Sequence, residues 1–539
     1  MKKNLLFLGL IIPIVTFTVL EPSAEAKYNV NTIVQTESGA LQGRAINGIY
    51  TYFGVPYAEA HERFVPAEKV KHWSGVRKST EYGSISLQSS LTGFPVPKGK
   101  QDNNAQNLNI WTPGIDGKKR AVMVWLHGGG FASGSAQEVS AYNGENLSRK
   151  GDVVVVSVNH RLNVMGHLDL SAYGEKYKYS ANVGIEDIVD SLEWIQRNIA
   201  SFGGDPNNVT VFGESGGGAK VLALMTSPHA KGLFQKGIVQ SGATESMGVN
   251  FTTLAASRRV GKLTLEKLGI TKNNLDAIQS VPYDKLVRES MKAQEETAGE
   301  FGLKGALTGK VSMDWEPVVD GDFLPTNPVT SDSFAIAGKD IPLLIGSNLN
   351  EWTSMNLVMG PDKGKNFSEA EIDQRLQKAY GANKDKVVAE FLKAFPTKTK
   401  ADALYFDTFI RLPILKIMSH KADQNGAPVY GYVFTYRSPF AIHTAEVPLV
   451  FNNADAESPI PTGAVTSQTE KQSISKMADA MSSAWISFAK TGKPDAASLP
   501  AWEAYTRATG ATMILDTDSS LVYGHDRNLM KIIAPDYQW

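Results

Sequence analysis

The chain has 539 residues, of which 42% are hydrophobic, and its 54 basic and 55 acidic side chains give a net charge of −1. This near balance gives no reason to expect nucleic acid or an anionic membrane as a partner. Because the chain contains no cysteine, disulfide bonds, thiolate metal sites and a cysteine nucleophile are all excluded.

The first 26 residues have the features of a secretory signal peptide. Lys2 and Lys3 provide a positive start, residues 5–20 are almost wholly apolar, and Ala24-Glu25-Ala26 offers a small-x-small cleavage site. The apolar stretch is shorter than the roughly 20 residues that a spanning helix needs, and it contains Pro13. We therefore expect cleavage near Ala26, export to the periplasm or the medium, and no membrane attachment of the mature chain. An uncleaved anchor is the alternative.

Short apolar runs, separated by stretches long enough for crossover helices, recur along the rest of the chain. Most of them do not alternate between apolar and polar residues, which is typical of strands covered on both faces. Such strands with helices between them predict an α/β fold with a large, mostly parallel central sheet. The runs are Ala121–Leu126, Val153–Val158, Val209–Phe212, Gly237–Gln240, Ile341–Ile345 and Val429–Thr435.

Helical periodicity is clear in Ile185–Asn198 and in Ser368–Tyr380, and the second of these begins with capping-box spacing. Residues 251–310 and 367–425 are mainly helical in pattern, and we expect them to be insertions beside the sheet and over the pocket. No internal repeat or long linker divides the chain. Residues 27–539 are therefore expected to form one catalytic domain.

A glycine turn follows the first of the predicted central strands. Val122–Leu126 runs directly into His127-Gly128-Gly129-Gly130-Phe131, the HGGG pattern of oxyanion holes in esterases and lipases. Backbone without side chains can bring NH groups to a substrate carbonyl oxygen, and loss of one such donor typically raises the barrier by about 3 kcal/mol. We expect the NH groups of Gly129, Gly130 and Gly216 to form this hole. A flexible turn after a strand is the alternative.

A second glycine turn carries a serine. The run Asn208–Phe212 is followed by Gly213-Glu214-Ser215-Gly216-Gly217, a G-x-S-x-G sequence, and then by an apolar helical stretch. A strand, this motif and a helix are the context of a nucleophile elbow, in which the glycines let strand and helix approach closely around a strained turn. We expect Ser215 to be the nucleophile of an acyl-transfer site. An ordinary glycine-rich turn is the alternative.

Further motifs accompany these two turns: Phe53–Ala58, Asn159–Leu162, Asn182–Gly184 with Asp187 and Trp194, Gly203–Pro206, and Trp485–Pro494. Together with His127–Phe131 and Phe212–Ser215, they resemble the signatures of the type B carboxylesterase and cholinesterase-like family, and in particular its bacterial para-nitrobenzyl-esterase-like members. The resemblance runs from about Val34 to the C-terminus. It implies an α/β-hydrolase fold and hydrolysis of carboxylic esters through a serine.

A serine hydroxyl needs a base within hydrogen-bond reach, and the base needs an orienting carboxylate. In this fold the chain order is serine, acid, histidine. Of the four histidines after Ser215, only His443 follows a strong strand, in a loop that can hang over the pocket, and it fits the family's H-x-x-E pattern through Glu446. The other three are His229, His420 and His525.

The acid is expected at Glu351. The strand Leu343–Ile345 runs into a loop that ends at this residue, and the resemblance puts the family's triad glutamate there. Asp320, which follows Val318 and Val319, is the competing carboxylate.

The resemblance also implies supporting roles. Glu214 is expected beside the triad, and Ser241 and Glu446 are expected to support it, although packing of buried polar groups is the alternative. The segment before Glu316 is expected to line an apolar acyl pocket of medium width, although these side chains can equally be core; they are Val311, Met313 and Trp315.

The loop at the expected pocket rim departs from the family pattern. Ser86 and Ala105 stand where many relatives have a disulfide, so we expect residues 86–105 to be mobile. This loop has no tryptophan to match the choline-binding one of cholinesterases, which argues against a quaternary ammonium substrate.

The implied reaction is hydrolysis of a small-molecule ester through an acyl-enzyme on Ser215. It needs no metal and no organic cofactor, and no H-E-x-x-H or similar spacing predicts a metal centre. The alternatives are a catalytically silent binding or adhesion module of the same fold, a peptidase, and a hydrolase specialised for lipid, polyester or toxin esters. The natural substrate and the oligomeric state are left open.

Overall fold

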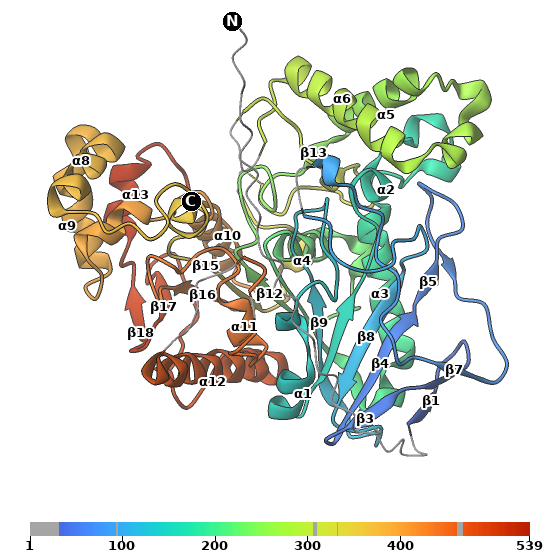
Figure 1. Cartoon of the computed structure of the whole chain (residues 1–539), viewed down its shortest axis with the longest axis horizontal. Coiled ribbons are helices and arrows are strands. Elements are labelled where there is room, and N and C mark those ends of the chain that lie inside the picture. The colour runs from blue at the N-terminus through green and yellow to red at the C-terminus, as the bar shows by residue number, and fades with distance from the viewer. Residues whose placement is uncertain (1–31, 93–94, 306–309, 331, 457, 461–466) are drawn as a thin grey trace, which may run out of the picture.

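A long twisted sheet forms the centre of the computed structural model, which describes residues 32–92, 95–305, 310–330, 332–456, 458–460 and 467–539 (Figure 1). The predicted signal peptide, residues 1–26, lies outside the described residues. Within them, the main sheet has eleven strands in the order β18-β17-β16-β15-β12-β11-β9-β10-β8-β4-β3. Strands β9 to β12 and β15 to β17 pair in parallel, while β3, β4, β8 and β18 pair antiparallel at the two edges. The predicted α/β fold with a mostly parallel central sheet is confirmed.

The strands of the main sheet are β3 (Arg44–Ile46), β4 (Ile49–Pro56), β8 (Asn107–Thr112), β9 (Arg120–Leu126), β10 (Val154–Val158), β11 (Gly204–Glu214), β12 (Lys236–Gln240), β15 (Leu343–Asn348), β16 (Val429–Phe434), β17 (Ala511–Leu515) and β18 (Ser520–Tyr523). Each predicted strand overlaps one of them. Every residue of β9, β10, β12, β15 and β16 is buried, as expected for strands covered on both faces. Three small sheets lie outside the main sheet among the described residues. One has three strands, β1 (Ile33–Gln35), β2 (Ala40–Gln42) and β7 (Val76–Lys78), and two have two strands each, β5 (Ala58–Glu59) with β6 (Glu68–Lys69), and β13 (Thr252–Thr253) with β14 (Val318–Val319).

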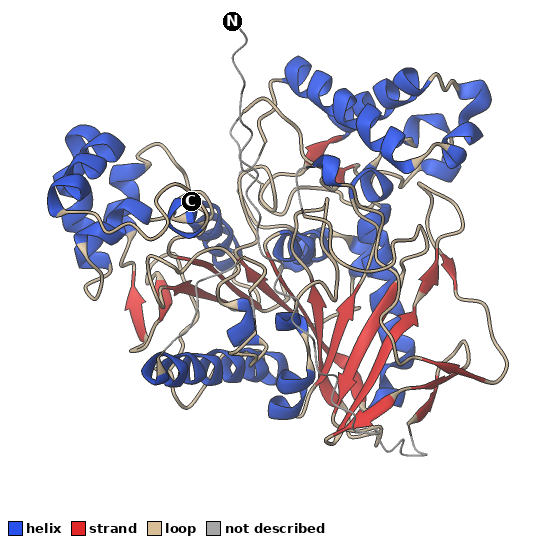
Figure 2. Ribbon diagram, in the orientation of Figure 1, coloured by secondary structure: helices blue, strands red, loops and turns tan. Residues whose placement is uncertain are grey.

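Helices flank the sheet and extend beyond its ends (Figure 2). Helix α4 packs on β11 and β12, α10 packs on β15 and β16, and α12 packs on β9 and β11. The paired helices α5 and α6 and the group α8 and α9 stand at opposite ends of the view in Figure 1. The helices are α1 (Glu145–Gly151), α2 (Asn163–His167), α3 (Val183–Asn198), α4 (Gly216–Thr226), α5 (Leu254–Leu268), α6 (Tyr283–Phe301), α7 (Met355–Val358), α8 (Glu369–Tyr380), α9 (Lys384–Ala394), α10 (Arg411–Asp423), α11 (Val447–Val450), α12 (Gln468–Thr491) and α13 (Arg527–Ile533).

Aromatic side chains stabilise the core next to the two glycine turns. Trp125, one residue before the end of β9, contacts Phe212 of β11 with 5.0 Å between ring centroids. Phe451 meets the same tryptophan edge to face, also at 5.0 Å. These contacts bind strands β9 and β11 to the segment that follows α11, and they hold the ends of both strands in a fixed relation.

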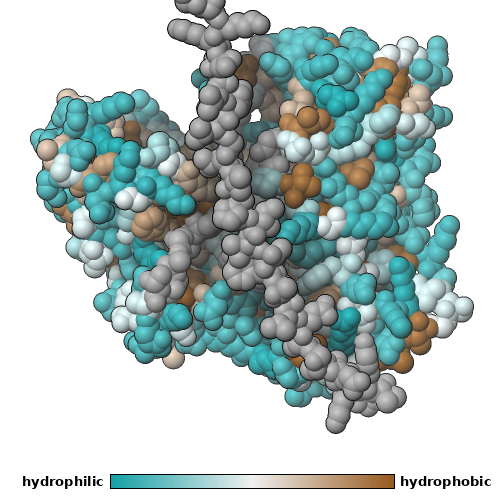
Figure 3. Space-filling model, in the orientation of Figure 1, coloured by the Kyte–Doolittle hydropathy of each residue, from teal (hydrophilic) through white to brown (hydrophobic). Residues whose placement is uncertain are grey.

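The molecular surface is mostly hydrophilic in the face that Figure 3 shows, where hydrophobic residues form small separate patches. No helix in the described part of the chain combines the length and the hydropathy that a bilayer crossing requires.

Candidate active site

Ser215 lies on the predicted elbow between β11 and α4. Its backbone has φ +55°, in the left-handed region that side chains rarely adopt, and its NH donates to the Gln240 carbonyl at 2.8 Å. A Cβ at Gly217 would overlap the Leu126 carbonyl oxygen, and one at Gly213 would lie 2.5 Å from the Gly217 carbonyl carbon. Both glycines are therefore required by the close approach of strand and helix, and the strained turn leaves Ser215 partly exposed.

The HGGG turn packs directly against this elbow. Gly129 and Gly130 have φ +81° and φ +62°, and a Cβ at Gly216 would overlap the backbone of Gly130. The Gly129 carbonyl accepts from the NH of Ser133 at 3.1 Å, which folds the turn back on itself. The NH groups of Gly129, Gly130 and Gly216 donate no hydrogen bond to any atom of the described residues. Three backbone donors from two turns are thus free to meet a ligand.

Glu351 is the carboxylate that meets His443. It is fully buried beyond the end of β15, and its Oε2 lies 2.6 Å from His443 Nδ1. Its Oε1 accepts hydrogen bonds from Ser241 Oγ and the Asn348 NH, both at 2.7 Å. The competing carboxylate, Asp320, instead accepts the NH groups of Asp322 and Leu324 at 3.0 Å in a tight turn. A carboxylate this close favours a proton on Nδ1, so that Nε2 is the nitrogen that gains or loses a proton when the ring titrates.

The other side of the His443 ring faces Glu214, the residue before Ser215. Nε2 lies 3.2 Å from Glu214 Oε1, and no hydrogen bond joins it to Ser215 Oγ in the described residues. A Cβ added to Gly128 would lie 3.2 Å from Glu214 Oε2 and 3.3 Å from Ser215 Cβ. The Glu214 carboxylate and the Ser215 side chain therefore both border Gly128. The structure therefore places the His443 ring between Glu351 and Glu214, and Glu214 precedes Ser215 on the elbow.

Two carboxylates dominate the electrostatics of His443. Burial lowers its pKa, but Glu214 and Glu351 outweigh that effect and raise the pKa to about 9. Burial raises the pKa of Glu214 well above its usual range, while the nearby imidazole lowers it. The negative charge of an ionised Glu214 therefore stabilises the protonated imidazole and affects how readily His443 gives up a proton.

A tryptophan that the sequence patterns did not single out covers the imidazole. The ring of Trp352, the residue after Glu351, lies 4.4 Å from the His443 ring, with 32° between the ring planes. Trp352 is half-buried, so it fixes the histidine on one face and presents apolar surface near the site.

Glu446 anchors a buried polar network that includes Gln240 and Asn348. Its two oxygens accept from Gln240 Nε2 at 3.0 Å and from Asn348 Nδ2 at 2.7 Å. Gln240 Oε1 in turn accepts from the indole NH of Trp485 at 3.1 Å. Gln240 and Asn348 end strands β12 and β15, so the network ties these strand ends to the segment that carries His443. Neither amide was predicted, because such pairing has no local sequence signature.

The residues expected to line the acyl pocket are spread over different environments. The side chain of Val311 is 57% exposed, whereas Trp315 is buried in a cluster with residues of α2, α5 and α6. Met313 packs against the same cluster. Their role as an acyl pocket stays a prediction.

Hydrogen bonds hold the loop that is expected at the pocket rim. The side chain of Gln88 exchanges two bonds with the backbone of Gly134, at 2.8 and 3.0 Å, and its NH donates to Gln101 Oε1 at 2.7 Å. Ser86 Oγ accepts from the Leu162 NH at 3.2 Å. The start of the loop is thereby attached to the body of the protein, and Gln101 is bonded to that start; the mobility of residues 86–105 stays a prediction.

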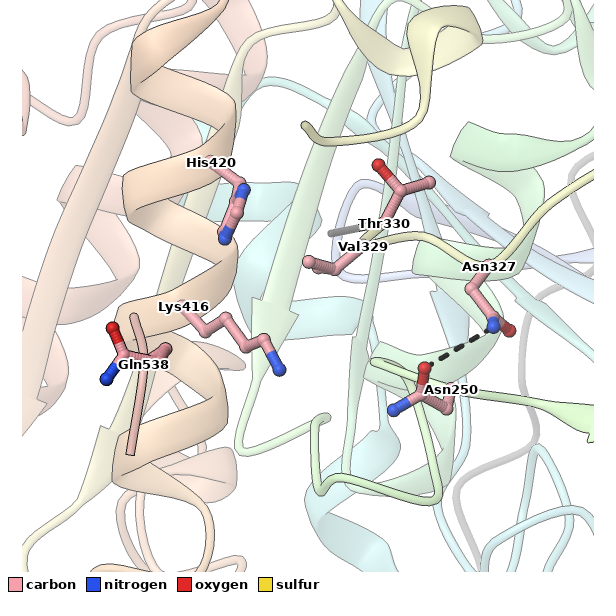
Figure 4. A pocket seen from close by; sticks show the side chains of 7 residues that line it. All are labelled: Asn250, Asn327, Val329, Thr330, Lys416, His420 and Gln538. Carbon is pink, nitrogen blue, oxygen red and sulfur yellow. Dashed lines mark hydrogen bonds between the residues drawn. The ribbon is translucent and has the colours of Figure 1, made fainter. Parts of the chain in front are cut away.

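A pocket of about 470 Å³ lies elsewhere, beside α10 (Figure 4). Lys416 and His420 project from this helix across the pocket from Asn250 and Asn327, whose side chains are joined at 3.3 Å. None of the residues predicted for the active site lines it; the lining residues are Asn250, Asn327, Val329, Thr330, Lys416, His420 and Gln538.

The sheet order and the strand-elbow-helix segment around Ser215 are those of an α/β-hydrolase. A sequence profile described as the carboxylesterase family matches residues 30–530. The chain is 33% identical over 503 residues to the para-nitrobenzyl esterase of Bacillus subtilis (strain 168), an alignment that covers 91% of this chain and 96% of the relative. It is 29% identical over 510 residues to the phenmedipham hydrolase of Pseudarthrobacter oxydans, covering 91% and 96% of the two chains.

Solved structures give the same result. An esterase from Clostridium hathewayi, described as able to hydrolyse aliphatic aromatic polyesters, superposes with a TM-score of 0.82 at 34% identity over 94% of this chain and 99% of that one. A Geobacillus stearothermophilus carboxylesterase superposes with a TM-score of 0.71 at 32% identity, over 93% and 99%. The chain belongs to the carboxylesterase family, and it is a carboxylic ester hydrolase.

Proposed function

We propose that Ser215, His443 and Glu351 form the catalytic triad of this esterase. The observation that carries the proposal is the pair of contacts on His443: Glu351 at 2.6 Å on Nδ1, and the Glu214–Ser215 elbow on the side of Nε2. Hydrogen bonds between nucleophile and base are often long without substrate and tighten when it binds. The absence of a Ser215–His443 bond here is compatible with that behaviour.

In the first half of the reaction, Nε2 of His443 takes the proton of Ser215 Oγ as the oxygen bonds to the ester carbonyl carbon. The bond from that carbon to the alcohol oxygen then breaks, and the imidazolium returns its proton to the leaving alcohol. In the second half, His443 takes a proton from water as the water oxygen bonds to the acyl carbon. The bond from that carbon to Ser215 Oγ then breaks, the imidazolium returns its proton to Oγ, and the carboxylic acid leaves. Glu351 holds the reacting tautomer throughout.

The free NH groups of Gly129, Gly130 and Gly216 are the proposed oxyanion hole. Charge develops on the carbonyl oxygen as Ser215 attacks, and preorganised donors stabilise that charge without having to reorient. The contact between the Gly130 backbone and Gly216 supports this role, because it brings donors from both turns to one side of Ser215.

We expect Glu214 to affect the pH range in which the enzyme is active. His443 acts as a base only when it is neutral, and the charge of Glu214 raises its pKa. We expect Glu214→Gln to lower that pKa and to shift the acidic limb of the kcat/KM profile toward lower pH. Glu186→Gln is the matched control, because burial raises the pKa of this carboxyl to about 7 but it lies on α3, away from the triad. A limb that stays in place in Glu214→Gln, or moves upward, would contradict the coupling.

The substrate class that we propose is small esters with an aryl group on the alcohol or acyl side. The half-buried indole of Trp352 beside His443 offers a stacking surface for such a group. The relatives include a para-nitrobenzyl esterase, a phenmedipham hydrolase and an esterase that hydrolyses aromatic polyesters. Two of these descriptions, para-nitrobenzyl esters and aliphatic aromatic polyesters, name substrates with an aromatic ring.

A series of p-nitrophenyl esters with acetyl, butyryl and octanoyl groups tests this function. We expect rapid turnover of the short esters by the mature protein, followed by slower turnover of the longest. A matched pair of cyclohexyl acetate and phenyl acetate tests the aryl preference. We expect the ratio of kcat/KM for phenyl acetate to that for cyclohexyl acetate to exceed the ratio of their uncatalysed hydrolysis rates. Folded protein that hydrolyses none of these esters would favour the silent binding module.

We also propose that the chain is exported and cleaved near Ala26. The positive start, the apolar stretch and the small-x-small site support this, and they are sequence features only. Mass spectrometry of the protein secreted by an expression host should find Lys27 at the N-terminus. Intact Met1 on cell-associated protein would contradict it.

A further inference from the structure

A buried lysine contacts the first residue of the HGGG turn. Lys220 is on α4, five residues after Ser215, and its side chain is completely buried. Its Nζ donates a hydrogen bond to the carbonyl oxygen of His127 at 2.9 Å. His127 is the first residue of the turn that presents the NH groups of Gly129 and Gly130, so one bond links the nucleophile helix to the start of that turn.

The surroundings of Lys220 supply little compensation for its charge. Three buried histidines lie within its electrostatic reach, and burial lowers the pKa of each, so that His127, His160 and His167 are neutral. The ring of Phe131, at the end of the turn, has its centroid 5.8 Å from Nζ. Glu138 is the one carboxylate whose charge favours the ammonium form among the described residues. Burial lowers the pKa of Lys220 to about 7 and raises that of Glu138 to about 7.

Burying an ammonium group without a close ion pair opposes folding, and an apolar side chain of the same length would fill this space at less cost. What Lys220 provides that an apolar residue could not is a donor to the His127 carbonyl. Because that carbonyl is part of the peptide plane leading into Gly128, a donor that holds it also fixes the direction in which the following NH groups point.

We propose that Lys220 is a positioning residue for the oxyanion hole, which holds the HGGG turn in its productive conformation through the His127 carbonyl. The proposal rests on the proposed function, because it assigns Lys220 a task in stabilising the oxyanion that forms on attack by Ser215. Lys220 itself touches neither substrate nor the reacting atoms.

A second buried lysine offers a matched control. Lys421 on α10 is also completely buried, and its Nζ donates to the carbonyl oxygens of Gly338 and Lys339, at 2.9 and 3.0 Å. Burial lowers its pKa to about 8. The two lysines therefore share burial, a cationic head and carbonyl acceptors, but only Lys220 contacts the candidate active site.

The test compares Lys220→Met with Lys421→Met in the full chain. For p-nitrophenyl acetate we expect Lys220→Met to lower kcat by about 10- to 100-fold with KM changed by less than about threefold, as for partial loss of an oxyanion donor. Binding of an aryl trifluoromethyl ketone, which forms a hemiketal oxyanion with the serine, should weaken by a similar factor. Lys421→Met should change Tm by a similar amount to Lys220→Met, while kcat and inhibitor binding stay within about twofold of the parent.

Lys220→Gln separates the hydrogen bond from the charge. It retains an NH donor of shorter reach, and we expect it to recover part of the lost kcat; it also keeps the proposal testable if Lys220→Met does not fold. Equal kcat and equal inhibitor affinity in the two methionine variants would overturn the proposal, as would a loss confined to KM. If the parent protein neither hydrolyses the ester nor binds the ketone, the proposed function fails instead, and the two failures are thereby distinguished.

Discussion

Replacement of Ser215 with alanine should lower kcat for p-nitrophenyl acetate by about 10⁴- to 10⁶-fold, the range found when a triad serine is removed. The physical reason is that Oγ forms the bond to the acyl carbon, and no other described hydroxyl lies on the strained turn between β11 and α4. Initial rates of purified parent and variant, measured at saturating ester, give the ratio directly.

Ser227→Ala is the matched control for that variant. Ser227 is buried at the other end of α4, where its Oγ donates to the Phe323 carbonyl at 2.7 Å. Its removal should cost about 1 kcal/mol of stability and leave kcat unchanged. Unaltered hydrolysis by Ser215→Ala would reject the assigned nucleophile, whatever the control shows.

His443→Ala should be about as damaging as Ser215→Ala, because triad members act as a unit. Without the imidazole, nothing accepts the serine proton, and the contact at 2.6 Å shows that Glu351 is placed to hold the ring and not to reach the serine in its stead. The double variant should therefore be no slower than either single variant. Steady-state measurement of kcat for the two single variants and the double variant tests this non-additivity.

His525→Ala serves as the control for loss of a histidine. Burial lowers the pKa of His525 to about 4, and its ring packs edge-on against Phe395 with 5.2 Å between centroids, away from the triad. We expect a stability loss with kcat preserved. Near-parental turnover in His443→Ala would remove this residue from the mechanism and with it the assigned triad.

Local sequence patterns predicted the elements that carry the site. The strand before HGGG, the strand and helix around Ser215, and the capping box of α8, formed by Ser368 and Glu371, are all confirmed. These features depend on residues close together in the chain, where hydrophobic runs, glycine spacing and capping preferences act directly.

The end of β15 is a feature that the local sequence pattern did not predict. The sequence predicted Ile341–Ile345, but the strand spans Leu343–Asn348. Its later residues, including polar Ser347 and Asn348, pair with Val433 and Phe434 of β16. Pairing with a strand some 85 residues away, and not apolar character, decides where this strand ends, and that end positions Glu351.

Side-chain partnerships across long separations were not predictable from one sequence. The bond from Lys220 to the His127 carbonyl joins residues 93 positions apart, and that from Gln240 to Glu446 spans 206 positions. The ring contact of Trp352 with His443 belongs to the same class. Each depends on the final packing of the sheet, which no hydrophobic period or motif spacing encodes.

Covalent labelling tests the central claim most directly. A fluorophosphonate reacts with an activated serine hydroxyl, and trypsin releases Ser215 in the peptide of residues 198–220, whose other serine is Ser201. Fragmentation of that peptide should place a single phosphonyl group on Ser215 in the parent protein and none in His443→Ala. A label on Ser201 or on another peptide, or an unlabelled chain that still hydrolyses esters, would contradict the proposed triad.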